Sequence, residues 1–307
     1  MSDYILRTHQ LTKKYKHDAA LKNVSISIKQ GDIYGFIGEN GAGKSTMLRV
    51  ITGLAFPTSG SIELFGKDYR NSLIKAQKRI GAIIEQPALF PNMTAEENLE
   101  VQRIQKGIPG KQRIEQTLEL VGLQNTGKKK VKHFSLGMKQ RLGLAIALLG
   151  DPEFLILDEP TNGLDPTGIV ELRHLIRKLN QDKGLTVLIS SHLLSELYQL
   201  ATCFGIIHQG RLLKEISAKE LDERCKQHLR IKVDQPTKAI TVIERDLHVT
   251  DFEVLADGTI KLYQHLDDIH NISKTLTDHG LIIEHLSQSG DDLESYFSKL
   301  IGGADHE

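Results

Sequence analysis

The stretch that decides the fold lies near the N-terminus and reads Gly38-Glu39-Asn40-Gly41-Ala42-Gly43-Lys44-Ser45, with Thr46 next. It matches the phosphate-loop pattern G-x-x-x-x-G-K-[ST], whose glycines let backbone N–H groups turn inward toward phosphate oxygens. Residues 32–37 form an apolar run before it, and a helix-like segment follows from Gly43. Strand, loop and helix therefore come in the required order. The pattern predicts that Lys44 faces the β- and γ-phosphates of a nucleotide and that Ser45 offers its hydroxyl to Mg²⁺.

A pair of acids follows a second apolar run. Residues 154–157 lead directly into Asp158 and Glu159. Ligands of open α/β sheets bind at the carboxyl ends of strands, so both acids should emerge beside the phosphate loop. There Asp158 would hold Mg²⁺ through water, and Glu159 would orient or deprotonate an attacking water. Without the phosphate loop, a surface acidic pair at the end of a strand would be the better interpretation.

The acids open a longer motif, Asp158-Glu159-Pro160-Thr161-Asn162-Gly163-Leu164-Asp165-Pro166. This run resembles the Walker B and D-loop segment of ATPases from ATP-binding cassette (ABC) transporters. Three further features stand where that family would place them. They are Gln86 after a strand, His192 after residues 186–191, and a signature-like run, Ser135-Leu136-Gly137-Met138-Lys139-Gln140-Arg141. The resemblance covers about residues 4–217.

The resemblance implies ATP and Mg²⁺ as cofactors and gives each residue a role. The implied catalytic residues are Lys44, Gln86, Glu159 and His192. The implied metal site consists of Ser45, Gln86 and Asp158, the last through water. Gly38 to Thr46 would bind the nucleotide, and Tyr15 would stack on its adenine. Ser135 and Gly137 would act in trans on ATP held by the other subunit of a head-to-tail dimer, with Asp165 in the D-loop.

The signature departs from the family's usual Leu-Ser-Gly-Gly-Gln. Leu136 stands at its first glycine and Met138 at its glutamine, while Ser135 and Gly137 remain. This form of the signature motif resembles that of the nucleotide-binding subunits of bacitracin-resistance and lantibiotic-immunity exporters. The tail, with Leu293-Glu294-Ser295-Tyr296-Phe297, also resembles the short C-terminal domain of that group.

The order of elements predicts an α/β fold with two domains. Residues 1–217 would form an ABC ATPase domain with a mostly parallel sheet, antiparallel strands at residues 4–10 and 24–28 around a Lys-rich turn, and a helical subdomain at about residues 87–150. Residues 218–307 predict a small α+β, ferredoxin-like domain of order β-α-β-β-α-β and a last helix from Asp291. Ala256, Asp257 and Gly258 suggest a two-residue hairpin turn within it.

The composition of the chain limits its expected partners and its expected location in the cell. Lys and Arg together number 39, as do Asp and Glu, so the net charge gives no sign of a nucleic-acid partner. No apolar run approaches the roughly 20 residues that span a bilayer. We expect a cytoplasmic chain held at the inner face of the membrane by a separate permease. Cys203 and Cys225 follow no redox spacing, and the histidines predict no zinc site.

Two functions compete. The first is the ATPase subunit of an exporter, paired with a second copy or a paralogous subunit and coupled to a membrane permease. The second is a soluble ABC ATPase that acts on a macromolecular partner without a permease. In the family the permease contact follows Gln86, so here it should lie between Gln86 and about Leu99, with Phe90 as the best candidate. Leu89 could equally belong to the core. The sequence does not name the cargo, and peptide antibiotics are suggested by family analogy alone.

Overall fold

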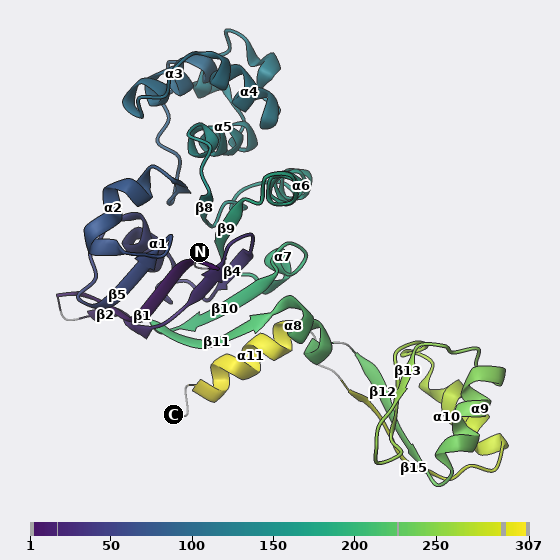
Figure 1. Ribbon diagram of the computed structural model, residues 1–307. Helices are drawn as coiled ribbons and strands as arrows, with labels where there is room; N and C mark the ends of the chain where they lie inside the picture. Colours follow the sequence, from purple (N-terminus) through teal and green to yellow (C-terminus); the bar gives the residue numbers. More distant parts are fainter. Residues whose placement is uncertain (1–2, 17, 226, 290–292, 305–307) are drawn as a thin grey trace. The chain divides into compact units, whose positions relative to one another are not determined.

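The computed structural model describes residues 3–16, 18–225, 227–289 and 293–304. The chain divides into two compact units, Met1–Ala218 (unit 1) and Lys219–Glu307 (unit 2). Unit 1 contains two sheets and a helical segment (Figure 1). Unit 2 contains one sheet with helices.

The main sheet of unit 1 positions the site. Its six strands run in the order β11-β10-β4-β9-β8-β7, and all neighbouring pairs are parallel except β10 with β11. Strands β4, β8 and β9 are buried along their whole length, as expected for parallel strands covered on both faces. The bounds are β4 (Ile33–Ile37), β7 (Ile80–Ile83), β8 (Phe154–Asp158), β9 (Thr186–Ser191), β10 (Cys203–His208) and β11 (Arg211–Ser217).

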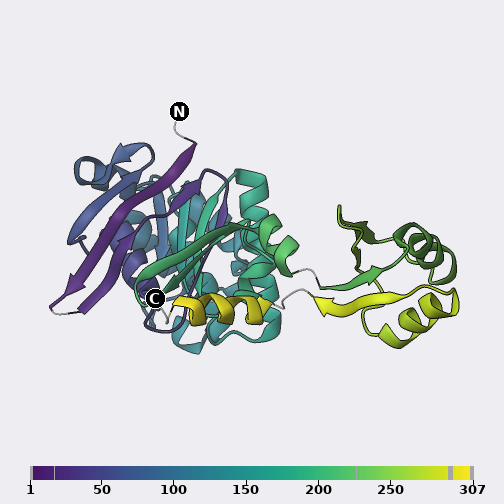
Figure 2. The same ribbon diagram turned by 90° about the horizontal axis from the view of Figure 1, so that it is seen from below.

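A second, antiparallel sheet forms a separate layer of unit 1 (Figure 2). The expected Lys-rich turn near its start was wrong. Strand β1 continues through Lys13 and Lys14, because their backbones pair with Leu21 and Ala19 of β2. The strands are β1 (Tyr4–Tyr15), β2 (Asp18–Val24), β3 (Ser27–Lys29), β5 (Ser59–Leu64) and β6 (Lys67–Asp68). Their apolar side chains share one core with β4, β8 and helix α1 (Lys44–Thr52).

The helical segment of unit 1 begins after β7. Thr94 and Glu97 form a capping box that starts α3, which contributes about 1 kcal/mol to helix stability. Gly107, Gly110 and Gly127 lie between the helices of this segment, and all three glycines have positive φ. Figure 1 shows α3, α4 and α5 gathered together. The elements are α3 (Ala95–Gln105), α4 (Gln112–Leu120), η1 (Gln124–Thr126), η2 (Val131–His133) and α5 (Leu136–Leu148). Helix α2 (Tyr69–Gln77) precedes β7 and lies outside this segment.

Three further helices follow β8. Asp165 caps the first of them by accepting a hydrogen bond from the Gly168 backbone N–H, with Pro166 in the first turn. They are α6 (Pro166–Lys183), α7 (Leu194–Tyr198) and α8 (Ala218–Cys225), of which α8 belongs to unit 2 except for Ala218. The parallel sheet, the antiparallel strands and the helices together confirm the α/β fold predicted for this part of the chain.

After α8, unit 2 has the element order that the sequence predicted. Its sheet runs β13-β14-β12-β15 and its paired strands are antiparallel. The hairpin turn is longer than predicted: Leu255 N–H donates to Thr259 O, leaving three residues between them. Asp291, the expected start of the last helix, lies outside the described residues. The elements are β12 (His228–Val233), α9 (Pro236–Asp246), β13 (Phe252–Val254), β14 (Ile260–Leu262), α10 (Ile269–Asp278), β15 (Ile283–Ser289) and α11 (Leu293–Ala304).

Candidate active site

The phosphate loop joins β4 to α1 and depends on its glycines. Gly43 is the N-cap of α1 with φ 109°, a conformation that side chains rarely adopt. A Cβ at Gly43 would lie 2.5 Å from Ala20 O, and one at Gly38 would lie 2.3 Å from Ile207 O. The loop therefore fits between β2 and β10 only with glycine at both places. No described side chain caps α1, so its first N–H groups can bind an anion.

Lys44 lies beneath this loop and is 4% exposed. Its Nζ donates to Gly38 O at 2.7 Å and to Glu39 O at 3.1 Å. The same ammonium lies 3.1 Å from Glu159 Oε1. A buried charge is stable only when it is paired, and these three acceptors meet that need.

Glu159 is held at the end of β8 by several bonds. Its φ of 45° lies in the left-handed region, which costs of order 1–3 kcal/mol for such a residue unless its surroundings hold it there. Its N–H donates to Ser190 Oγ at 2.9 Å, and Asn162 N–H donates to Glu159 O at 3.2 Å. His192 Nδ1 lies 3.2 Å from Glu159 Oε2. The structure thus joins Lys44, Glu159 and His192, which are far apart in sequence.

The ionisation of Glu159 reflects two opposed effects. Burial of the side chain raises its pKa, but hydrogen bonds from Asn162 at 2.6 Å and from Lys44 outweigh this. The positive charge of Lys44 acts in the same direction. The net result is a pKa of Glu159 below its usual value, so the carboxylate is ionised at neutral pH.

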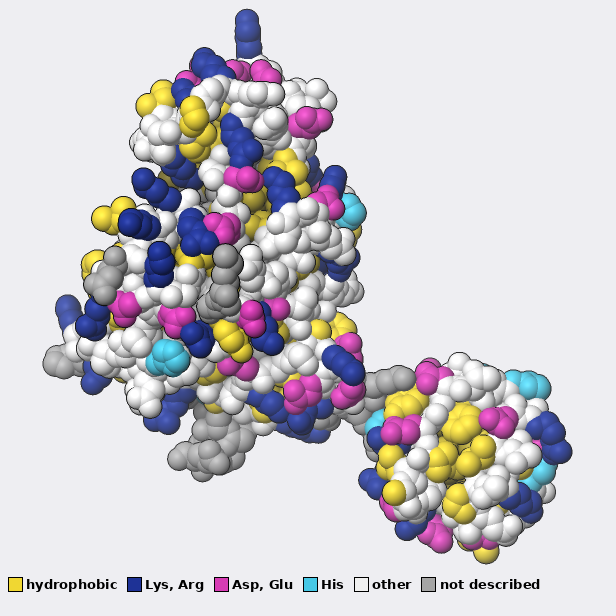
Figure 3. Space-filling view, viewed as in Figure 1, with side chains coloured by type: hydrophobic (Ala, Val, Ile, Leu, Met, Phe, Trp, Pro, Cys, Tyr) yellow, Lys and Arg dark blue, Asp and Glu magenta, His cyan; other side chains and the backbone are white. Residues whose placement is uncertain are grey.

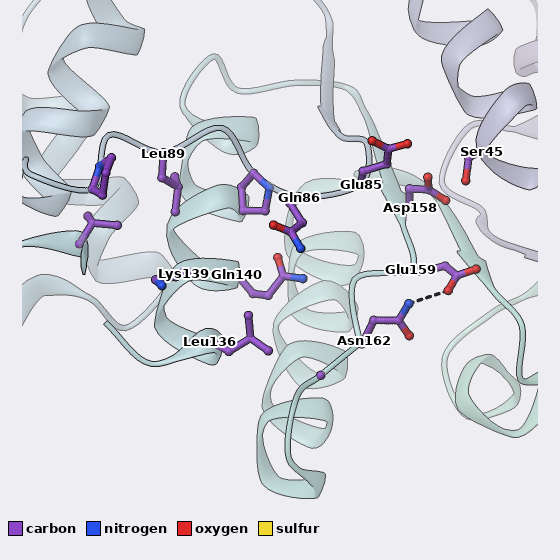
Figure 4. Close-up of a pocket in the computed structure, with 14 residues that line it drawn as sticks. Ser45, Glu85, Gln86, Leu89, Leu136, Lys139, Gln140, Asp158, Glu159 and Asn162 are labelled. Carbon is purple, nitrogen blue, oxygen red and sulfur yellow. Dashed lines mark hydrogen bonds between the residues drawn. The ribbon is translucent and has the colours of Figure 1, made fainter. Parts of the chain in front are cut away.

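A cavity of about 730 Å³ opens beside these residues and is lined by Ser45, Gln86, Asp158 and Glu159 among others. Figure 4 shows Ser45, Asp158 and Glu159 on one side and the side chains of Gln86 and Gln140 facing one another. Asp158 is buried and accepts a hydrogen bond from Ser190 Oγ at 2.7 Å. A hydroxyl and one carboxylate next to a phosphate site are the oxygen ligands that Mg²⁺ uses together with nucleotide phosphates.

Ser135 and Gly137 line a second hollow, of about 890 Å³, together with Asp165. This hollow adjoins the first cavity, because Leu136, Gln140 and Gly163 line both. Ser135 is the N-cap of α5 and accepts a hydrogen bond from Met138 N–H at 3.2 Å. Leu136 is 50% exposed and packs against the D-loop: a Cβ at Gly163, whose φ is 75°, would lie 2.6 Å from Leu136 Cδ2. Ser135, Gly137 and Asp165 are therefore not part of the cluster around Lys44.

Comparisons with known proteins identify the family. A family model described as ABC transporter matches residues 21–162. The bacitracin transport ATP-binding protein BcrA of Bacillus licheniformis is 47% identical over 299 residues, covering 97% of this chain and 98% of that protein. The chain belongs to the ABC transporter ATP-binding proteins. It is an ATPase of that family.

Other members of the family are also similar to this ABC ATPase. BcrA of Enterococcus faecalis is 41% identical over 98% of this chain and 97% of that protein. The lantibiotic transport ATP-binding protein SrtF of Streptococcus pyogenes is 45% identical over 71% of this chain and 92% of that protein. The dimeric post-hydrolysis structure of the ATP-binding cassette MJ0796, bound to ADP and Pi, matches with a TM-score of 0.64 and 29% identity, covering 69% of this chain and 98% of that one. ABC ATPases bind ATP and generally require Mg²⁺.

Tyr15 ends β1, where its ring is 44% exposed and Lys13 Nζ lies 4.8 Å from the ring centroid. An exposed aromatic ring can stack on a base, and the resemblance assigned this one to adenine.

Within the described residues, no helix of this ABC ATPase is both long and apolar enough to cross a membrane. Transport by such a subunit requires a membrane permease as partner.

Sequence reasoning missed several residues of the site. Asn162 lies within the quoted Walker B run and received no role, although it bonds Glu159. Ser190 joins Asp158 to the Glu159 backbone from the neighbouring strand. A hydroxyl at the end of an apolar strand was the available signal for Ser190. Glu196 on α7 carries no such signal in the sequence and emerges only from the structure.

Proposed function

We propose that this ATPase powers the export of a peptide antibiotic of the bacitracin or lantibiotic class through a separate membrane permease. The support comes from the names of its relatives, two of which match it over nearly their full length. No comparison favours a soluble ATPase without a permease. The observation that most supports ATP hydrolysis as the power source is the contact of Lys44 and His192 with one carboxylate, that of Glu159.

In the proposed site the phosphates of ATP lie in the loop from Gly38 to Thr46. The α1 N-terminus and Lys44 supply positive charge to the β- and γ-phosphates. Ser45 would ligate Mg²⁺ directly and Asp158, on the same side of the cavity, through water, while Gln86 would reach it from across the cavity. The metal would supply neutralisation of phosphate charge. Tyr15 would stack on adenine.

Glu159 would align the attacking water and accept its proton. Because its pKa is lowered, Glu159 is a weak base, and its contribution would come more from position than from basicity. His192 would donate a hydrogen bond to the γ-phosphate. Its Nδ1 lies 3.2 Å from Glu159 Oε2, so the two side chains are adjacent, which supports their acting on the same water and phosphate.

Ser135, Gly137 and Asp165 would complete the site of a second subunit. They line a hollow whose lining includes none of Lys44, Ser45, Asp158 and Glu159, which supports their acting on ATP held by another chain. Ser135 caps only the Met138 N–H, and the other backbone donors in the first turn of α5 suit a γ-phosphate delivered by a partner. Two subunits paired head to tail would form two such composite sites. The partner would be a second copy or a paralogous subunit.

The permease would dock on an apolar surface near Gln86. Large exposed apolar side chains lie on α2, on α3 and in the loops after α1 and before α3. Figure 3 shows such side chains among Lys and Arg over α2 and the helical segment. They are Leu54, Phe56, Ile74, Phe90 and Ile104. Asn98, fully buried, bonds both Phe90 N–H at 2.7 Å and Phe90 O at 3.1 Å, which fixes the turn while the ring is 42% exposed. Leu89 is half-buried and lines the cavity of about 730 Å³ beside Ser45 and Asp158, and Leu99 is fully buried.

Charge at Phe90 tests this docking surface. We expect Phe90→Asp to retain ATP binding and to lose most co-purification with the permease encoded beside it. The matched control is Val254→Asp in unit 2, because Val254 is also 42% exposed. Equal permease recovery in both variants would contradict the proposed surface.

Resistance in cells tests the cargo. A bacitracin-sensitive or lantibiotic-sensitive strain carrying this ATPase and its permease should tolerate more of one peptide than the same strain with Lys44→Ala. The substitution removes the charge beneath the phosphate loop, so the permease remains but ATP turnover stops. Identical inhibitory concentrations for both strains, with every peptide of the two classes, would refute the proposed cargo.

A further inference from the structure

One carboxylate oxygen joins the two segments that carry Glu159 and His192. Glu196 Oε2, on α7, accepts a hydrogen bond from Thr161 Oγ1 at 2.8 Å and another from Ser191 Oγ at 2.8 Å. Thr161 follows Glu159 by two residues, and Ser191 directly precedes His192. The two segments leave neighbouring strands, β8 and β9. Glu196 therefore spans the gap between them.

The two hydroxyls are buried, which makes this bridge important. Thr161 is 6% exposed and Ser191 is 1% exposed. Hydrogen bonds to an ionised acceptor are stronger than neutral ones, and a buried hydroxyl that loses its partner is costly. Ser191 Oγ also accepts from Leu193 N–H at 3.0 Å, so it fixes the turn on both sides of His192.

The bridge through Glu196 adjoins a second set of polar contacts, around Asp158 and Glu159. Ser190 Oγ donates to Asp158 and accepts from the Glu159 N–H, while His192 contacts the Glu159 carboxylate. The ends of β8 and β9 are thus joined at Ser190 and again at Glu196. Glu196 itself bonds neither the phosphate loop nor Glu159 or His192 within the described residues.

We propose that Glu196 is a positioning residue that sets the separation of Glu159 and His192 for ATP hydrolysis. The proposal rests on the roles given above to Glu159 and His192. A tether of this kind acts on turnover rather than on nucleotide affinity, because the phosphate loop keeps its own contacts. Displacement of a reacting group by about 1 Å can cost about 100-fold in rate.

The decisive variants are Glu196→Ala and Glu196→Gln. The amide oxygen of glutamine can accept both hydroxyl bonds, whereas alanine accepts neither. We expect Glu196→Ala to lower kcat by about tenfold or more with ATP affinity changed less than about twofold, and Glu196→Gln to restore most of kcat. Ser195→Ala, an exposed neighbour on α7, is the matched control and should keep the parent kcat. A normal kcat in Glu196→Ala, or a Glu196→Gln variant as slow as Glu196→Ala, would overturn the proposal.

A double-mutant cycle separates the tether from a general loss of stability. Thr161→Val removes one hydroxyl at nearly constant volume and should lower kcat alone but not further in the Glu196→Ala background. Fully additive losses would overturn the tether. If Glu196→Ala melts too early to assay, Thr161→Val decides alone: a lowered kcat with normal ATP affinity supports the proposal, and an unchanged kcat overturns it. Glu159→Gln, assayed in parallel, tests the role of Glu159 on which this proposal rests. Normal hydrolysis by that variant would refute the role of Glu159 itself, whereas a normal kcat in Glu196→Ala alone would refute only the role of Glu196.

Discussion

Lys44 is 4% exposed and contacts three acceptors, whereas Ser135 is exposed and accepts one local bond from Met138. The phosphate-loop face of unit 1 is a buried polar network that ties β4, β8 and β9 together. The signature face is the exposed start of one helix, α5, resting on Gly163 through Leu136. The first face is assembled within one chain, and in the proposed head-to-tail dimer the second would find its ligand only across the subunit interface. This contrast predicts different consequences for substitutions on the two faces.

The largest effect should follow a change in the buried network. Glu159→Gln keeps the shape of the side chain but cannot accept a proton from water, so we expect turnover to fall by about 100-fold or more while MgATP still binds. Trapped ATP should hold the subunits together, which gel filtration with MgATP would detect as a dimer. If the Glu159→Gln variant stays monomeric with MgATP and releases phosphate at the parent rate, the role given to Glu159 in the buried network is wrong.

The next effect tests whether the signature face acts across a dimer. Ser135→Arg and Lys44→Ala should each abolish turnover alone. In an equal mixture, half of the dimers are mixed and each holds one intact composite site, so about a quarter of the parent turnover should return. The measurement is phosphate release against the ratio of the two chains. Parent-level turnover by Ser135→Arg alone would show that the signature face is not needed.

A smaller effect is expected where the signature meets the D-loop. Gly163→Ala places a Cβ 2.6 Å from Leu136 Cδ2 at a φ of 75°, so we expect turnover to fall by about tenfold. Adding Leu136→Gly removes the clash but not the strained backbone. The double variant should therefore recover part of the loss, as measured by turnover and melting temperature. No recovery would mean that backbone strain alone sets the effect.

The smallest effect concerns pH. Asn162 helps to keep the pKa of Glu159 below its usual value, while burial acts in the opposite direction. In Asn162→Ala the pKa of Glu159 should rise, and activity that needs the carboxylate is lost as pH falls through this pKa. The ratio of turnover at about pH 5.5 to that at about pH 8 should be lower in the variant than in the parent. An unchanged ratio would show that Asn162 does not set this ionisation.

The sequence predicted the motif residues of the phosphate-loop face better than the hydrogen bonds that join them to the rest of the fold. Gly38 to Ser45 and the Walker B run were found because their chemistry requires fixed residues at fixed spacing. Asn162, Ser190 and Glu196 were missed, because common polar residues acquire meaning only when the fold brings them to a partner. His192 and Gln86 were found by resemblance alone. Periodicity likewise predicted most elements of the fold but not the extent of β1, whose pairing with β2 extends the strand through Lys13 and Lys14.

The three acceptors around Lys44 also bear on the entropy of binding. Ordering a free lysine side chain costs up to about 2 kcal/mol in lost rotamers. Here the contacts with Gly38, Glu39 and Glu159 restrict the ammonium when the chain folds. A nucleotide that arrives later meets a charge whose rotamers are already fixed, so less of its interaction energy is lost to ordering.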